Sequence, residues 1–361
     1  MNILNVKIKA QEESSYPVIT GQGLLEHAYE YIEKYTAAKK FLIVTNPVVY
    51  ELYGKYLKHP DAVFCILPDG ERYKTMEYLN KAVDCALENR LERGDAFIAL
   101  GGGVIGDTAG FAASVYLRGI DFIQIPSTLL AQTDSSIGGK TAVNHRLGKN
   151  LIGAFYQPKL VLTDINTLNT LDERQFKTGL SEIIKYSFIE KNCGAEKFFN
   201  MLDFLKDNAR NIKAKNPKTL EKLITMCCTL KSAVVNKDEK EKGLRAFLNF
   251  GHTYAHAVEN ITNYEKYTHG EAVSIGIKLI FDLALKLGRV DETYRNEALE
   301  LLNEYGLITE LDFKPDKEAF YNAMLSDKKV KDGGAVFVMP CARAFSEIVK
   351  NIDKKLVIQG I

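Results

Sequence analysis

The sequence predicts an α/β half built on a parallel sheet, followed by a half that is mostly helical. In the first half, short apolar runs alternate with helical patterns, at residues 41–44, 63–67, 96–100, 122–126 and 160–162. Strands that are apolar throughout are typical of a parallel sheet covered on both faces. After Asp164 such runs nearly vanish until residues 335–339. We therefore expect two domains, residues 1–164 and 165–361.

The individual elements follow from local patterns. Residues 1–9 alternate apolar and polar side chains, as a strand does. The first three apolar runs end at Thr-Asn-Pro, Pro-Asp-Gly and three glycines, which are turn signals. Helices are expected at 171–186, 196–210, 219–235, 253–261, 271–287 and 293–305. Ligands of such folds gather where the parallel strands end, and the polar motifs of the first half occur there.

Composition excludes several classes of protein. The chain has 361 residues, a formal net charge of +1 and 26% charged residues, so no overall bias favours nucleic acid or membrane surfaces. No apolar run has the length of a membrane span. The six cysteines lack Cys-x-x-Cys spacing and are expected to be reduced thiols. We therefore expect a cytoplasmic protein.

A glycine-rich turn follows the run at 96–100. Gly101, Gly103 and Gly106 satisfy Gly-x-Gly-x-x-Gly at the start of a helical stretch. Glycines there let the backbone approach a pyrophosphate, and the helix N-terminus offers free N–H groups. The alternative is a tight turn that needs glycine only for its geometry.

A second polar segment covers residues 132–140 and continues at 148–150. It carries Lys140 and Lys149 beside a glycine pair, between strongly apolar flanks. Lysine suits phosphate as a point charge, and polar loops between buried segments often carry function. The alternative is a surface loop with solvated lysines.

Three of the six histidines lie in one short window, at His252, His256 and His269. Imidazole is the commonest side-chain metal ligand, and Glu182 upstream is a candidate carboxylate to complete a zinc site. His252 and His256, four residues apart, share a helix face, and a surface helix can carry such a pair without function. Thr253 occupies the position of the metalloprotease base, which argues against a peptidase.

Several segments in the same order resemble 3-dehydroquinate synthases. They are 69–74, 101–140, 148–155, 182–185, 238–256 and 327–329, and together they extend over about residues 40–330. The resemblance implies an N-terminal Rossmann-like domain, an all-α C-terminal domain and a site in the cleft between them. It also implies an NAD- and zinc-dependent (or cobalt-dependent) lyase of the shikimate pathway and aromatic amino acid biosynthesis. Such an enzyme converts 3-deoxy-D-arabino-heptulosonate 7-phosphate into 3-dehydroquinate and phosphate, through transient oxidation by NAD, phosphate elimination, re-reduction and an internal aldol closure.

The resemblance also assigns roles to residues. The metal ligands it implies are Glu182, His252 and His269, which makes His256 a catalytic histidine instead of a ligand. The substrate and catalytic residues it implies are Arg118, Lys140, Asn150, Lys185, Lys231, Arg245, Asn249, His256 and Lys328 or Lys329. The cofactor residues it implies are Asp69, Gly70, Glu71, Arg72, Tyr73, Lys74, Gly102, Gly103, Val104, Ile105, Gly106, Asp107, Ser127, Thr128, Asp134, Lys140, Lys149, Thr167, Leu168, Asn169 and Thr170, with Asn46 near the adenosine.

Spacing suggests how some of these side chains meet. Arg245, Asn249, His252 and His256 would form one stripe on a continuous helix, unless a helix starts at Gly251. Arg118 is similar to a family arginine that reaches the substrate phosphate from the neighbouring subunit, so the expected partners are a small sugar phosphate and a second copy of the chain.

Three other functions remain open on the sequence. Another sugar phosphate cyclase would act on a different ketose phosphate, and such relatives tend to change the residues at Lys231, Arg245 or His256. A metal-dependent polyol dehydrogenase would share the two-domain plan but accumulate NADH. A non-catalytic binding protein on the same fold would not need the full set of metal and lysine residues.

Overall fold

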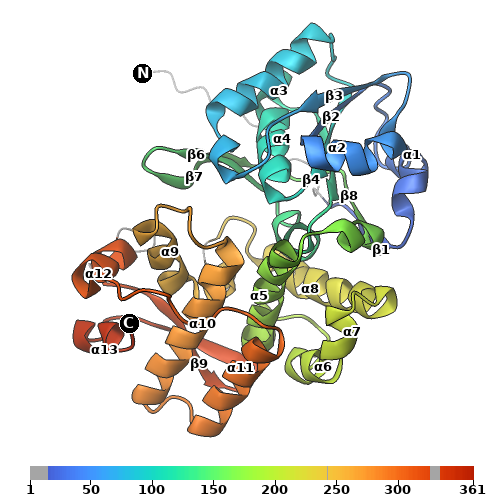
Figure 1. Cartoon of the computed structure of the whole chain (residues 1–361). Helices are drawn as coiled ribbons and strands as arrows, with labels where there is room; N and C mark the ends of the chain where they lie inside the picture. Colours follow the sequence, from blue (N-terminus) through green and yellow to red (C-terminus); the bar gives the residue numbers. More distant parts are fainter. Residues whose placement is uncertain (1–14, 242, 326–333) are drawn as a thin grey trace, which may run out of the picture.

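The computed structural model describes residues 15–241, 243–325 and 334–361. Figure 1 shows a sheet-containing part at the top and a largely helical part below it. The strand expected at residues 1–9 and the family lysines at 328 and 329 lie outside the described residues. No helix within the described ranges is both long and apolar enough to cross a bilayer.

A six-stranded sheet forms the centre of the upper part. Every pair of neighbouring strands in it is parallel. In spatial order the strands are β1 (Val18–Gly21), β8 (Leu160–Asp164), β5 (Asp121–Pro126), β4 (Ala96–Gly101), β2 (Phe41–Thr45) and β3 (Ala62–Ile66). The five predicted apolar runs are β2, β3, β4, β5 and β8, and the short edge strand β1 was not predicted.

Successive residues of the strands face opposite sides of the sheet, and both sides are buried. Leu42 and Phe97 pack against α3 (Met76–Glu88) and α4 (Gly103–Val115). Ile43 and Ile98 pack on the other side, with residues of α1 (Ala28–Ile32), α2 (Pro47–Tyr53) and the 3₁₀ turn that follows it. This double coverage explains why the strands are apolar throughout.

An antiparallel hairpin extends sideways from this part, above α9 (His252–Ile261) in Figure 1. It consists of β6 (Lys140–His145) and β7 (Gly148–Phe155), and β6 packs on α4. A single turn of π-helix (Ala131–Ser135) precedes it. The sequence favoured a polar functional loop here and did not predict strands.

The lower part has one large hydrophobic core. Its helices are α5 (Glu173–Ile189), α6 (Met201–Asp207), α7 (Ala209–Lys213), α8 (Pro217–Lys237), α9 (His252–Ile261), α10 (His269–Lys286), α11 (Glu292–Glu304), α12 (Lys317–Leu325) and α13 (Lys354–Ile358). An antiparallel pair, β9 (Phe337–Ala342) and β10 (Phe345–Val349), adds to them. The prediction of a helical second half is confirmed, with this strand pair as an addition to the expected all-α domain. The helix predicted at 196–210 is instead two short helices, with Asn200 in a left-handed conformation before α6.

Candidate active site

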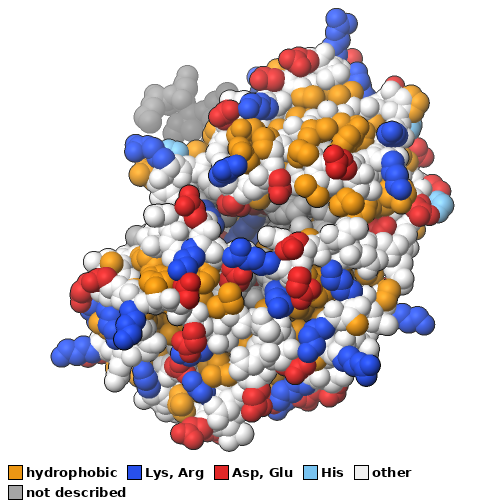
Figure 2. Space-filling model, in the orientation of Figure 1, with side chains coloured by type: hydrophobic (Ala, Val, Ile, Leu, Met, Phe, Trp, Pro, Cys, Tyr) orange, Lys and Arg blue, Asp and Glu red, His pale blue; other side chains and the backbone are white. Residues whose placement is uncertain are grey.

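The candidate site lies where the start of α4 and the β6–β7 hairpin meet the helical part, near α5, α8, α9 and α10 (Figure 1). Figure 2 shows the surface hollowed between the two parts, with Lys and Arg side chains gathered there. These elements come from both halves of the sequence. Side chains that bind the two ends of a small anionic molecule can therefore converge in this hollow.

Three predicted metal ligands meet at its base. One ligand atom each of Glu182, His252 and His269 lies within 4.8 Å of the other two. Glu182 Oε1 is 3.2 Å from His252 Nε2 and 3.1 Å from His269 Nε2. One carboxylate oxygen and two imidazole nitrogens form a donor set that suits zinc and leaves further coordination positions open. The cluster that the sequence predicted is therefore brought together by the fold.

Local structure explains how the three side chains are placed. Glu182 lies in the middle of α5, which Asp172 caps by accepting the N–H of Arg174 at 2.9 Å. Gly251, at φ 76°, ends one segment and starts α9 at His252. Thr268 and Glu271 form a capping box that starts α10 at His269. Two of the ligands are thus the first residues of helices.

Both imidazole rings present Nε2 to Glu182. His252 Nδ1 lies 3.0 Å from the Phe250 carbonyl, and His269 Nδ1 lies 3.3 Å from Glu259 Oε1. Both acceptors are oxygens, so each Nδ1 carries a proton. Burial lowers the pKa of His252 to about 4, which leaves its Nε2 as a free lone pair near neutral pH. A neutral imidazole of this tautomer is a metal ligand.

The electrostatics of the cluster favour a cation. Burial opposes charge on Glu182, but the ammonium group of Lys185 holds the pKa of this carboxyl well below its usual range. Burial also opposes charge on His269, yet the carboxylates of Glu259 and Glu182 raise its pKa to about 10. Positive charge is thus stabilised at the point where the ligands converge.

Two predicted substrate lysines are buried beside this cluster. Lys185 is 2% exposed, and its Nζ lies 2.5 Å from Glu182 Oε2. Lys231 on α8 donates to the carbonyl of Asp134 at 2.6 Å and to its Oδ1 at 2.7 Å. Burial lowers the pKa of Lys231 against the attraction of Asp134. Buried ammonium groups with this few partners are suited to bind an anion.

Arg245 and Asn249 lie in a 3₁₀ turn (Leu244–Asn249) before α9. Arg245 donates to the carbonyl oxygens of Glu239 at 2.7 Å and Gly138 at 3.2 Å. Gly251 separates this turn from α9, so the four side chains do not share one continuous helix, and the alternative of a helix start at Gly251 is the one that the structure has. His256 does share the face of His252, with ring centroids 5.5 Å apart.

The glycine turn leads directly from β4 into α4. Within the described chain, no side chain caps this helix, so the N–H groups of its first turn face outward from its N-terminus. The glycines here are required by close packing. A Cβ at Gly102 would lie 2.9 Å from Thr128 Cγ2, and one at Gly106 would lie 2.9 Å from Gln124 Oε1. The turn is therefore tight, and the helix end that it precedes has no side-chain cap.

Other predicted cofactor residues surround this turn. Asp69 accepts from Asn46 Nδ2 at 2.8 Å, and Gly70 has φ 117°. Lys74 donates to Asp107 Oδ2 and to Asn150 Oδ1, each at 2.6 Å. The remaining members lie in the turn after β3, in the first turn of α4, in the π-helical turn, on the β6–β7 hairpin, and just after strands β5 and β8. Among them, Ser127 donates its N–H to Gly101, and Thr167 accepts from Gln132 at 2.9 Å.

Arg118 lies apart from this group. It is exposed, in a turn where both Leu117 (φ 49°) and Arg118 (φ 70°) adopt left-handed conformations. Its predicted role requires a second subunit.

Three side chains at the site were not predicted as site residues. Glu241 is 2.7 Å from Lys140 Nζ, Tyr186 donates to Asp134 Oδ1 at 3.2 Å, and Glu259 bonds His269 and Lys149. Glu259 could have been noticed in the sequence, because it is an acidic residue about one helical turn after His256 on the helix that carries His252 and His256. Nothing in the local pattern marks Glu241 or Tyr186.

Comparison with known proteins agrees with this geometry. Residues 64–178 match the family model "3-dehydroquinate synthase N-terminal", and residues 179–330 match "3-dehydroquinate synthase C-terminal". The chain belongs to the 3-dehydroquinate synthase family. A 3-dehydroquinate synthase of Nostoc punctiforme is 43% identical over 99% of this chain and 98% of its own. One of Shewanella pealeana is 46% identical over 97% and 96%.

Solved structures of other cyclases share the fold of this family member. ValA, a 2-epi-5-epi-valiolone synthase from Streptomyces hygroscopicus with NAD+ and Zn2+ bound, is 26% identical with a TM-score of 0.86, covering 98% of each chain. A 2-deoxy-scyllo-inosose synthase complexed with carbaglucose-6-phosphate, NAD+ and Co2+ is 26% identical with a TM-score of 0.83, over 96% of this chain and 97% of its own.

Proposed function

We propose that this family member converts 3-deoxy-D-arabino-heptulosonate 7-phosphate into 3-dehydroquinate and inorganic phosphate, as an NAD- and metal-dependent carbon–oxygen lyase. The observation that carries the proposal is the cluster of the buried Glu182 and His252 with the half-buried His269, beside the ammonium groups of Lys185 and Lys231. The sequence similarity to 3-dehydroquinate synthases over nearly the whole chain supports the choice of substrate.

The residues present fit both implied groups. The nitrogen, nitrogen and oxygen donors suit Zn2+ or Co2+, the ions named in the two cyclase structures. The uncapped N-terminus of α4 suits a pyrophosphate such as that of NAD. We assign NAD to residues 1–164, and the metal and most substrate contacts to residues 165–361.

When bound, NAD supplies a hydride acceptor and the divalent cation polarises a substrate hydroxyl. The chain's own residues then bind and orient the substrate. Lys185 and Lys231 are already desolvated, so an anionic group that reaches them gains strong charge-assisted hydrogen bonds. Arg245 offers a planar fork for a carboxylate or phosphate.

Proton transfer falls to His256 in this proposal. Its ring lies beside His252 and is half-buried, which places an imidazole next to the metal cluster without making it a ligand. Imidazole exchanges protons near neutral pH, as both elimination of phosphate and the later aldol step require. Asn150 and Asn249 would orient substrate hydroxyls, Lys140 would bind an anionic group, and Lys328 would add a further cation.

We further propose a homodimer, because the exposed Arg118 has a role only if a second copy brings it to the substrate. A cytoplasmic location is proposed from the six free thiols.

A substrate panel tests the proposed function. Purified protein with NAD and Zn2+ is offered the heptulosonate 7-phosphate, a heptulose 7-phosphate that lacks the carboxylate, and glucose 6-phosphate. We expect phosphate release from the first alone, together with formation of 3-dehydroquinate. Faster turnover of either sugar phosphate that lacks the carboxylate would indicate another sugar phosphate cyclase. Accumulation of NADH without phosphate would favour a polyol dehydrogenase.

A further inference from the structure

Glu259 is a buried acid that the proposed chemistry does not use. It lies near the end of α9, is 2% exposed, and faces the start of α10. A carboxylate this deeply buried needs partners that offset the loss of hydration. Glu259 does not belong to the group of three metal-ligating side chains, so any role must act through the residues that it contacts.

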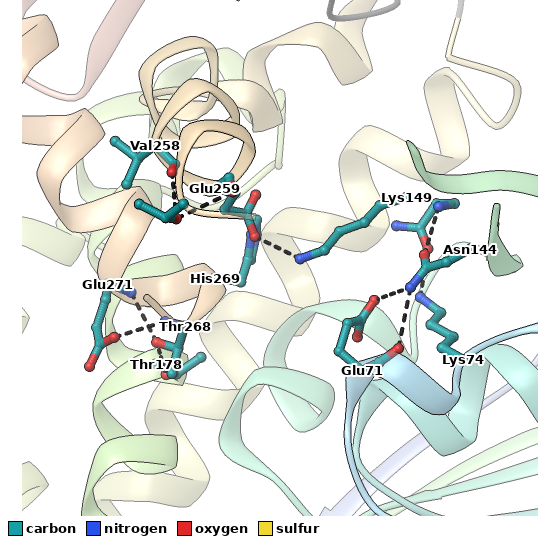
Figure 3. Close-up of polar contacts among 12 residues, drawn as sticks. Glu71, Lys74, Asn144, Lys149, Thr178, Val258, Glu259, Thr268, His269 and Glu271 are labelled. Atoms are coloured by element: carbon teal, nitrogen blue, oxygen red, sulfur yellow. Dashed lines mark hydrogen bonds and ion pairs between the residues drawn. The ribbon is translucent and has the colours of Figure 1, made fainter. Parts of the chain in front are cut away.

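One oxygen of Glu259 joins two residues from different parts of the molecule. Oε1 lies 3.3 Å from His269 Nδ1 and 3.0 Å from Lys149 Nζ. Figure 3 shows the Lys149 side chain reaching across to Glu259, with His269 beside the same carboxylate. An ionised carboxylate only accepts hydrogen bonds, so the Nδ1 proton of His269 is fixed on this side and Nε2 faces Glu182.

Lys149 connects this carboxylate to the cofactor side. It is a residue of β7, and its ammonium group also lies 4.5 Å from the ring centre of Tyr264, in the segment between α9 and α10. The next residue, Asn150, accepts from Lys74, which also bonds Asp107 in the first turns of α4. A chain of direct contacts thus runs from the glycine turn to His269.

We propose that Glu259 is a positioning residue that fixes the orientation of His269, and that Lys149 links this contact to the β6–β7 hairpin. The inference rests on the proposed function, because it assumes that His269 binds a metal. Outer-sphere carboxylates of this kind orient a ligating imidazole and raise its basicity. The shared oxygen means that the hairpin and the metal site stabilise each other, since a coupling between two sites acts in both directions.

Metal affinity measured without NAD or substrate tests this directly. Co2+ and Zn2+ dissociation constants are determined by competition with a chromophoric chelator for the wild type, E259Q, K149M, the double variant, and E265Q as a control in the exposed segment before α10. We expect E259Q to weaken binding about tenfold to 100-fold and to change the visible absorption spectrum of bound Co2+. K149M should weaken binding to a smaller extent, roughly threefold or more, because the carboxylate itself remains. E265Q should bind like the wild type.

The double variant tests the link. If Lys149 acts through Glu259, adding K149M to E259Q should produce no further loss of metal affinity. A dissociation constant for E259Q within about twofold of the wild type would overturn the positioning role, since the expected loss is at least tenfold. Equal effects of K149M with and without Glu259 would overturn the link. If E259Q does not fold, an unchanged metal affinity of K149M would overturn the proposal on its own.

The outcome is separable from that of the proposed function. The titration uses neither NAD nor sugar phosphate, so weakened binding in E259Q stands even if no phosphate is released in the substrate panel. If the wild type releases phosphate and E259Q keeps wild-type metal affinity, the proposed function stands and only the positioning role of Glu259 is refuted.

Discussion

Replacing Glu182 with glutamine removes the charge at the centre of the buried cluster while keeping the shape of the side chain. Glu182 is 1% exposed and lies 2.5 Å from the buried ammonium of Lys185. Removing one partner of a buried ion pair costs about 3–5 kcal/mol. The glutamine amide oxygen can still face the Lys185 ammonium, so we expect the free energy of unfolding of the metal-free protein to fall by about 3 kcal/mol.

The same substitution removes one of three metal ligands. Loss of an outer-shell partner costs about tenfold to 100-fold in metal affinity or activity, and loss of a direct ligand should exceed the upper figure. We therefore expect phosphate release by E182Q to fall by more than about 100-fold. Chemical denaturation, chelator competition and a phosphate-release assay measure the three effects on one preparation.

A matched control lies directly after the same helix. Glu190 follows α5, is 3% exposed, and accepts the N–H of Met201 at 2.8 Å, away from the metal cluster. E190Q should lower stability while the folded fraction retains metal affinity and turnover. Wild-type turnover by E182Q with metal still bound would refute the reasoning.

Three further outcomes are expected. R245K should lower kcat/KM for the sugar phosphate at least about tenfold, because a lysine cannot reproduce the planar fork of the guanidinium; an unchanged value would exclude a direct contact. G102A should raise the KM for NAD about tenfold, since a Cβ would lie 2.9 Å from Thr128 Cγ2 beside the first turn of α4; a change confined to the sugar phosphate KM would argue against a cofactor role. Burial raises the pKa of Cys193 from 9.0 to about 12. The folded state keeps this thiol protonated while the unfolded state ionises above pH 9, so stability should fall between pH 9 and 12 by up to about 1.4 kcal/mol per pH unit. Denaturation of C193A across this window should give a shallower slope, and an unchanged slope would contradict the assignment.

Much of the fold was predictable because buried parallel strands leave a clear signal. Leu42 and Ile43 face opposite sides of the sheet and are both fully buried, so the run at 41–44 is apolar at every position. The β6–β7 hairpin gave no such signal, because every residue of β7 is exposed or half-buried and the strand begins with a glycine and two polar residues. β1 has only four residues, all half-buried, at the edge of the sheet.

The site was predictable in its members and less so in its geometry. Histidine is scarce in this chain, which singles out His252, His256 and His269 as a candidate metal site. Their spacing alone did not show which of the three bind the metal. The assignment of His252 and His269 as ligands came from the family resemblance. The break at Gly251, with φ 76°, was noted as an alternative to one long helix and is what the structure has. Long-range contacts were out of reach of the sequence. Glu259 meets Lys149 across 110 residues, and no local pattern encodes that pairing.

The proposed reaction requires NAD to act as a catalyst beside a single bound cation. The decisive measurement follows phosphate and NADH together, with heptulosonate 7-phosphate in large excess over NAD. We predict many phosphates released per NAD, no net NADH, arrest by a chelator, and recovery on adding Zn2+ or Co2+. Phosphate limited to one per NAD, or release that continues at full rate in the metal-free protein, would contradict the account.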